Sequence, residues 1–202
     1  MKKRLYFNKF DDMKYISHLD LMRFIERIFK RAHIELKYSQ GFHPRPKISF
    51  ANPISLGTEA YNEPMDIEIE DELSCSEIIA RINEINVLGF KVESAEDLDV
   101  KASIAEDFES INYEISGEDK LIQELEKLFS QESIIEEKEK KGKITTRDLK
   151  DRIVTFKREK NKIYITLINM SPNSFLNMLD IQPSDVQIKR LGYNKKTGGA
   201  LC

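Results

Sequence analysis

The first half of the chain alternates between two spacings of hydrophobic residues. Alternation of apolar and polar residues, typical of half-buried strands, occurs in five short segments. These expected strands are residues 4–10, 34–38, 47–51, 65–70 and 89–93. Spacings of three and four residues predict one helix after Ser17, a favourable N-cap residue, and a second over residues 75–87. The apolar face of the first helix, which we expect to be buried, comprises Leu19, Met22, Ile25, Phe29 and Ala32.

Two of the expected strands in this half need a further comment. Residues 47–51 are either a separate strand or a bulged continuation of residues 34–38. In residues 65–70 the alternation places Asp66, Glu68 and Glu70 opposite the apolar side chains, so we expect an acidic outer face on this strand.

A similar order of patterns returns in the second half. The expected strands are residues 109–115, 132–138, 152–158, 162–168 and 185–191. The expected helices cover residues 118–130 and begin again at Ser171-Pro172, and the charged residues 136–143 resemble an exposed hairpin tip. The order strand–helix–strand–strand–helix–strand predicts an α+β fold of two tandem ferredoxin-like (split βαβ) units with antiparallel sheets. We expect them at residues 1–97 and 108–192, followed by a mobile tail at 193–202.

The charge of the chain is distributed unevenly. Its formal net charge is −3, but residues 1–50 carry 12 basic and 5 acidic side chains, and residues 51–100 carry 2 and 13. The net charges of these two segments are therefore +7 and −11. This contrast predicts a polarised molecule, with a basic region for an anionic ligand and an acidic region that faces away from it or contacts a protein.

The composition excludes several classes of protein. At 40% hydrophobic residues the chain can form a core, and no apolar run is long enough to cross a membrane. The N-terminus is not a secretory signal, and the two cysteines, Cys75 and Cys202, lie far apart, so we expect a cytoplasmic protein without disulfides. Motifs for nucleotide binding, zinc peptidases and serine hydrolases are missing, and we predict no metal site and no cofactor in this chain.

The most informative segment is Gly41-Phe42-His43-Pro44-Arg45-Pro46-Lys47. Its two prolines exclude regular structure and stiffen the loop, Phe42 can stack on a base, and Arg45 and Lys47 suit phosphate. If residues 34–38 form the second strand, this loop lies beside the N-terminus of the first helix, which favours anions. The predicted ligand or RNA site comprises Ser17, His18, Arg23, Arg27, Gly41, Phe42, His43, Arg45 and Lys47.

Plainer interpretations exist for each of these features. The loop is as well explained as a rigid connection, His18 as a residue that donates to a neighbouring carbonyl, and the basic helix face of Arg23, Arg27, Lys30 and Arg31 as a solvated surface. A second basic patch is equally well explained as charged protection of strand edges. Its members are Arg147, Lys150, Arg152, Lys189 and Arg190.

Three segments of the chain resemble a known family. They are Tyr15–Arg23, Ser39–Ala51 and Pro53–Gly57, and they are similar to the bacterial radical-SAM-linked proteins of unknown function. The stretch 41–47 is the most specific part, whereas Lys150 stands where that family usually has Arg. The resemblance implies a radical SAM protein as partner, which would carry the iron–sulfur cluster and S-adenosylmethionine, and it suggests RNA or ribosome metabolism by association.

We therefore expect a non-catalytic RNA- or substrate-binding accessory module of a radical SAM enzyme. One alternative is a metal-free RNA-processing enzyme in which His18 and His43 act as general acid and base. Another is a protein-interaction scaffold that docks its partner through the acidic residues 59–77. The oligomeric state and the identity of the RNA do not follow from the sequence.

Overall fold

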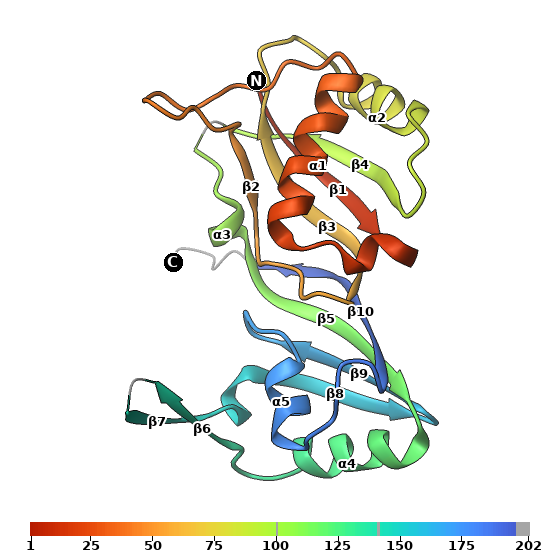
Figure 1. The fold of residues 1–202 in the computed structure, drawn as a ribbon, viewed down its shortest axis with the longest axis vertical. Coiled ribbons are helices and arrows are strands. Elements are labelled where there is room, and N and C mark those ends of the chain that lie inside the picture. The colour runs from red at the N-terminus through yellow and green to blue at the C-terminus, as the bar shows by residue number, and fades with distance from the viewer. Residues whose placement is uncertain (100, 141, 197–202) are drawn as a thin grey trace, which may run out of the picture. The chain divides into compact units, whose positions relative to one another are not determined.

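The structure is a computed structural model that describes residues 1–99, 101–140 and 142–196. It is a mixed α+β fold with mostly antiparallel strand pairing and few helices (Figure 1). The chain divides into two compact units. Unit 1 comprises Met1–Glu109 together with the residues from Gly192 onward, and unit 2 comprises Ser110–Leu191. The predicted domain ranges, residues 1–97 and 108–192, remain a prediction.

Unit 1 contains an antiparallel sheet with two helices on one face. Its elements are β1 (Lys2–Lys9), η1 (Asp11–Tyr15), α1 (His18–Arg31), β2 (Ile48–Phe50), β3 (Glu59–Glu68), α2 (Cys75–Glu84), β4 (Phe90–Asp97) and α3 (Ile104–Asp107). The strands are ordered β4-β1-β3, and β2 pairs with β3. The apolar residues of α1, α2 and the sheet form one core, which shows that both helices cover the same face.

Helix α1 begins where the sequence predicts it. The Ser17 hydroxyl accepts a hydrogen bond from the backbone N–H of Asp20 (3.1 Å) and so caps the helix. The predicted buried face is wrong at Leu19, which is 55% exposed, and Met22 is only half-buried. The helix buries Leu21, Ile25, Ile28 and Phe29, so the inward face is turned away from Leu19.

Residues 34–38 are not a strand, contrary to our expectation. They make only isolated bridges, Leu36 with Ile69 and Tyr38 with Pro46. The second strand is instead β2, a separate element that pairs with β3 in antiparallel register. The sequence does not decide between the two segments, because apolar and polar residues alternate in both. In the structure, only Ile48–Phe50 pairs with β3 over consecutive residues.

The expected acidic outer face of residues 65–70 is also wrong in part. Met65, Ile67 and Ile69 point into the core as predicted, but Asp66 is buried. Asp66 lies directly opposite Arg4 in the β1–β3 register, and the two side chains form a bidentate ion pair. A charged residue in an alternating pattern can therefore face a second, polar layer of side chains instead of solvent.

Unit 2 repeats the strand order of unit 1. Its elements are β5 (Phe108–Gly117), α4 (Asp119–Phe129), β6 (Ile135–Lys140), β7 (Lys143–Asp148), η2 (Lys150–Arg152), β8 (Ile153–Glu159), β9 (Lys162–Leu167), α5 (Asn173–Met178) and β10 (Val186–Lys195). The main sheet is ordered β10-β5-β9-β8. When the strands of each sheet are counted along the chain, both units have the order fourth, first, third, second.

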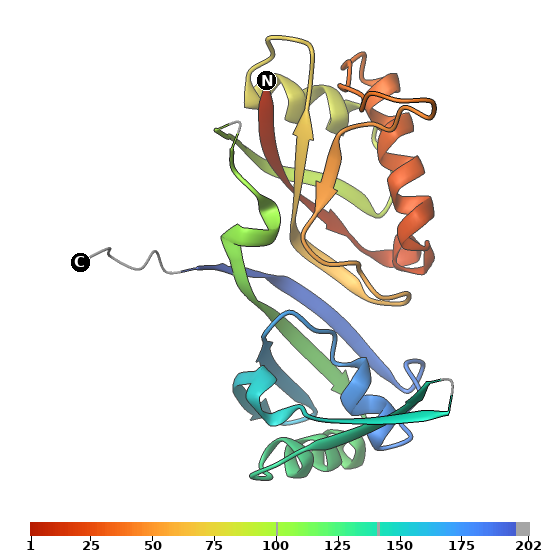
Figure 2. The ribbon, with the colours of Figure 1, turned by 90° about the vertical axis from the view of Figure 1, so that its left-hand side faces the viewer.

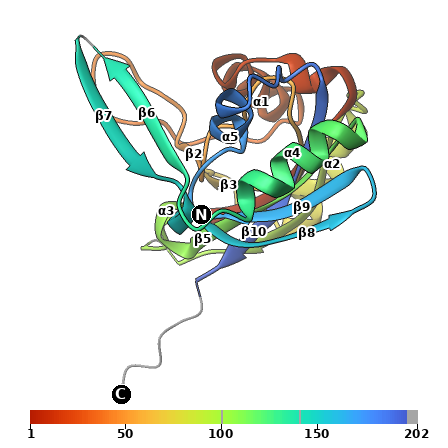
Figure 3. The ribbon, with the colours of Figure 1, turned by 90° about the horizontal axis from the view of Figure 1, so that it is seen from below.

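The β6–β7 region and the C-terminal segment differ from expectation. The strand predicted near 132–138 and the hairpin tip predicted at 136–143 are one two-stranded hairpin, β6–β7, separate from the main sheet (Figure 3). The predicted mobile tail at 193–202 begins too early, because β10 extends to Lys195 and Tyr193 packs against Phe108 with 5.2 Å between ring centroids. Residues 197–202 lie outside the described part of the chain.

In the described part of the chain, no helix is long and apolar enough to span a membrane.

Candidate functional site

The candidate site is centred on residues 39–47, which we name the Phe42 loop. The loop is closed at its base by backbone hydrogen bonds: Ser39 N–H donates to the Arg45 carbonyl (2.8 Å) and Lys47 N–H to the Lys37 carbonyl (2.7 Å). The Ser39 hydroxyl also accepts from the Arg45 N–H (3.0 Å). Gly41 has a φ of +129°, a conformation that favours glycine at the start of the tip. These contacts hold an irregular loop in one shape.

The tip of the Phe42 loop presents side chains to solvent. Phe42 has a relative exposure of 104%, so its ring buries nothing within the chain. In the residues that the structure describes, the side chains of His43 and Arg45 have no hydrogen-bond or ion-pair partner, and both are exposed. A large aromatic side chain that is fully exposed between unpaired polar groups indicates a contact surface more than a connection.

The basic residues around the loop fall into two groups. Lys37 pairs with Glu70 (3.6 Å) and Lys47 with Glu68 (2.9 Å), so their charges are compensated locally. On α1, Arg23 pairs with Asp20 (3.4 Å). Within the described residues, the side chains of Arg27, Lys30, Arg31 and Arg45 have no such partner and are exposed. These four cations are the ones available to an anionic ligand.

The structure does not bring Ser17 and His18 beside the Phe42 loop. Because the second strand is β2 and not residues 34–38, the loop precedes this strand and lies where α1 ends, whereas α1 begins at the other end of unit 1 (Figures 1 and 2). His18 packs edge-on against Phe50, the last residue of β2, with 5.4 Å between ring centroids. The predicted composite site is therefore wrong in its geometry.

The N-terminus of α1 also offers little to an external anion. The Asp20 carboxylate lies in the first turn and accepts a hydrogen bond from the Ser17 hydroxyl (2.7 Å). An acidic side chain at this place already compensates the positive end of the helix dipole. Ser17 thus serves the helix as a cap.

The second basic patch is not a common surface. Arg147 forms an ion pair with Glu136 across the β6–β7 hairpin, and Lys150 Nζ donates to the Phe129 carbonyl (2.6 Å) at the end of α4. Arg190 is 1% exposed and stacks over the Tyr113 ring at 5.7 Å. Lys189, its neighbour on β10, is half-buried, and only Arg152 is freely exposed. Most members of the predicted patch therefore support the fold of unit 2.

The acidic residues 59–77 are also used within unit 1. Glu59 pairs with Lys14 (3.6 Å), and Asp71 accepts from the Glu35 N–H (2.8 Å). Glu77 completes a capping box with Ser74 at the start of α2, and the hydrogen bond from the Ser74 hydroxyl lowers the pKa of Glu77. Most of these carboxylates therefore have partners within unit 1.

A buried polar cluster lies on the face of the unit 1 sheet opposite the helices. The Arg4 guanidinium contacts Asp66 (2.6 and 3.0 Å) and Asp107 (2.6 Å), and it lies 5.0 Å from the centre of the Phe108 ring. Burial opposes the charge of Arg4, but the hydrogen bonds to the two carboxylates outweigh it and raise the pKa of Arg4. No local pattern in the sequence signals this cluster, because Asp66 and Asp107 lie 62 and 103 residues from Arg4 along the chain.

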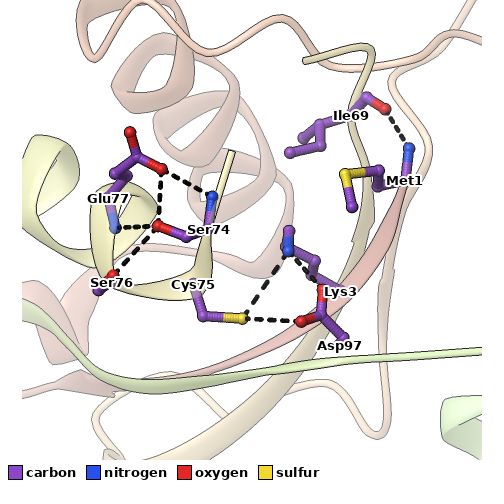
Figure 4. Close-up of polar contacts among 8 residues, drawn as sticks. All are labelled: Met1, Lys3, Ile69, Ser74, Cys75, Ser76, Glu77 and Asp97. Carbon is purple, nitrogen blue, oxygen red and sulfur yellow. Dashed lines mark hydrogen bonds and ion pairs between the residues drawn. The ribbon is translucent and has the colours of Figure 1, made fainter. Parts of the chain in front are cut away.

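Figure 4 shows a second polar cluster, in which Cys75 lies beside Lys3 and Asp97. Lys3 forms an ion pair with Asp97, and its Nζ is 3.8 Å from Cys75 Sγ, which is 3.9 Å from Asp97 Oδ2. The hydrogen bond from Lys3 lowers the pKa of Asp97. Among the described residues, no three His, Cys, Asp or Glu side chains form a group that could hold a metal ion.

The comparison with protein families gives one result. The model of a family described as an uncharacterized protein conserved in bacteria (DUF2344) matches residues 2–179. The chain belongs to this family. The match covers the Phe42 loop, the Arg4 cluster and the β6–β7 hairpin, so all three lie in the part of the chain that the family shares. No curated protein matches the chain.

Proposed function

We propose that this member of the family is a non-catalytic module that binds single-stranded RNA through its Phe42 loop. The observation that carries the proposal is the complete exposure of Phe42 beside the unpaired Arg45 on a loop that hydrogen bonds hold in place. An exposed ring can stack on any base, and a nearby guanidinium can contact the phosphate backbone. A preformed loop also loses little conformational freedom on binding.

The surrounding charge supports the same ligand. Lys30 lies on α1 beside Tyr38, the residue before the loop, which donates a hydrogen bond to Glu26 (2.9 Å). Arg27 precedes Lys30 by three residues and so lies on the same side of the helix. Together with Arg45 they supply about three cations, enough for a salt dependence with a slope of about −2 on single-stranded RNA. We further propose that both units are ferredoxin-like, which their shared strand order supports.

An accessory role for a radical SAM protein belongs to the same proposal. Its support is the resemblance of the Phe42 loop sequence to the radical-SAM-linked proteins. A nuclease based on His18 and His43 is less favoured, because His18 contacts the end of β2 and His43 precedes its start. A general acid and base would have to meet across a common space, and this placement of the two residues does not support such a pair.

The test is the binding of a fluorescein-labelled single-stranded RNA of about twelve nucleotides, measured by fluorescence anisotropy at several KCl concentrations. We expect Phe42→Ala and Arg45→Ala each to weaken binding at least about fivefold, the range for one base stack or one phosphate contact. The matched control is Arg23→Ala, because this arginine lies on the same helix but pairs with Asp20.

Three results would contradict the proposal. The wild-type chain could fail to bind RNA at low salt, both loop variants could bind like the wild type, or Arg23→Ala could weaken binding as much as Arg45→Ala. Cleavage of the RNA in EDTA that is lost in His43→Ala would instead support the enzymatic alternative.

A further inference from the structure

An open groove of about 610 Å³ lies between the C-terminal half of α1 and residues 33–38. Its polar lining includes Glu26, Lys30, Glu35, Tyr38 and Asp71. We name it the Tyr38 groove. It is continuous in sequence with the Phe42 loop, which starts at the residue after Tyr38. A nucleotide bound at the loop would therefore have its neighbour close to the groove.

The walls of the Tyr38 groove are fixed by hydrogen bonds. The backbone of Glu35 is held on both sides, since its N–H donates to Asp71 (2.8 Å) and its carbonyl accepts from the Glu70 N–H (2.9 Å). The Tyr38 hydroxyl donates to Glu26 (2.9 Å), while the residue remains 43% exposed. These contacts hold the Tyr38 ring, the Glu26 carboxylate and the Glu35 backbone in defined positions.

Two charged side chains of the groove remain without a partner in the described part of the chain. They are the Glu35 carboxylate and the Lys30 ammonium group, both exposed. The other two carboxylates are engaged, because Glu26 accepts from Tyr38 and Asp71 from the backbone of Glu35. A ligand that satisfies the free pair must present hydrogen-bond donors to a carboxylate and an acceptor to an ammonium group.

We propose that the Tyr38 groove is a subsite for a guanine base of the RNA bound at the Phe42 loop, an inference that rests on the proposed function. Guanine presents two adjacent donors, N1–H and the N2 amine, which a carboxylate accepts together, and O6 and N7 acceptors for Lys30. Adenine, cytosine and uracil do not combine two adjacent donors with such acceptors. The exposed ring of Tyr38 provides the stacking surface.

The experiment compares guanine with inosine, which differs only by lacking the N2 amine. Labelled twelve-nucleotide uridine RNAs with one central guanosine or inosine are titrated by anisotropy against the full chain. We expect the guanosine RNA to bind about tenfold tighter, within the discrimination expected of one bidentate contact. In Glu35→Gln this ratio should fall to about one, since the amide has a single acceptor oxygen and its NH2 group cannot accept the second, parallel hydrogen bond. The matched control is Glu72→Gln, an exposed neighbour outside the groove.

The outcomes separate the inference from the function on which it rests. If both RNAs bind equally and the binding still depends on Phe42, the guanine subsite is wrong and the proposed function stands. If neither RNA binds, the proposed function is wrong, and calorimetry with guanosine and inosine monophosphate decides the groove. A Glu35-dependent preference for guanosine monophosphate would then support the subsite, and equal or absent binding would overturn it.

Discussion

Arg4 and Arg45 lie in two basic segments of unit 1 and have opposite surroundings. Arg4, in the N-terminal Lys2-Lys3-Arg4 sequence, is 1% exposed and contacts two carboxylates. Arg45, in the Phe42 loop, is exposed and has no partner among the described residues. Both contribute equally to the net charge of +7 of residues 1–50, but only the second can meet a ligand.

The comparison shows why a local excess of charge overstates the charge available for binding. Lys3, Arg4 and Lys9 are each 1% exposed, although they stand in a segment that reads as strongly basic. Lys3 pairs with Asp97, and Lys9 Nζ donates to the Ile16 carbonyl (3.3 Å). Cations on β1 therefore stabilise the fold, and the proposed binding surface depends on cations near the end of α1 and in the loop.

The largest effect that separates the two arginines should be on stability. Arg4→Ala leaves the buried carboxylate of Asp66 unpaired, so we expect it to lower the free energy of unfolding by about 3–5 kcal/mol. Arg45→Ala removes no internal contact, and we expect a change of no more than about 0.5 kcal/mol. Urea unfolding followed by circular dichroism measures both. Equal stabilities of the two variants would show that the Arg4 cluster is not a structural element.

The next effect concerns Phe42, whose substitution should lower RNA affinity but not the stability of the fold. Because the ring buries nothing, Phe42→Ala should leave the urea midpoint unchanged while it weakens RNA binding by about 1–3 kcal/mol. Phe7→Ala provides the contrast, since Phe7 is fully buried in the core and its loss should cost about 3–5 kcal/mol of stability. A loss of stability in Phe42→Ala would mean that the loop folds back onto the chain in solution.

The sequence predicts most elements of this fold but not their contacts across the sheet. Hydrophobic spacing locates α1, α2 and β9, because each buries one regular face. It detects only the C-terminal part of β3, in which residues 63–67 are buried on both faces. It misplaces the second strand, since residues 34–38 alternate as well as 47–51 and only pairing with β3 distinguishes them. Because of this one error, the predicted position of the Phe42 loop is at the wrong end of α1.

The candidate site is predictable to a similar extent. The composition of residues 41–47 indicates an irregular, basic, aromatic loop, and the structure contains one. Whether a charge is free depends on partners distant in sequence, such as Glu68 for Lys47 and Glu136 for Arg147. The roles of Glu35 and Tyr38 depend on contacts with residues 71 and 26, and no local pattern signals them.

A smaller effect should distinguish the two basic residues of the loop itself. Lys47 pairs with Glu68, whereas Arg45 is unpaired. We expect Arg45→Ala to reduce the slope of log affinity against log KCl by about 0.7, the value for one lost phosphate contact on single-stranded RNA. Lys47→Ala should change the slope by less, because its charge is already compensated. Equal changes in slope would show that the Lys47–Glu68 pair opens when RNA binds.

The smallest effect is a pH dependence beside the Arg4 cluster. Burial, followed by the hydrogen bond that the Tyr6 hydroxyl donates to Glu96 (2.7 Å), raises the pKa of Tyr6 to about 12 from an ordinary value of 10.0. The unfolded chain therefore loses this proton at a lower pH than the folded chain, and the stabilising contribution is present below pH 10 and is lost as the pH rises towards 12. Melting curves of the wild type and Tyr6→Phe should differ below pH 10 and converge by pH 12. If the difference between them is constant over this range, the pKa of Tyr6 is not raised in the folded chain. Tyr6 and the polar side chains beside Arg4 would then be accessible to solvent, as Arg45 is, and the contrast between the two regions would fail.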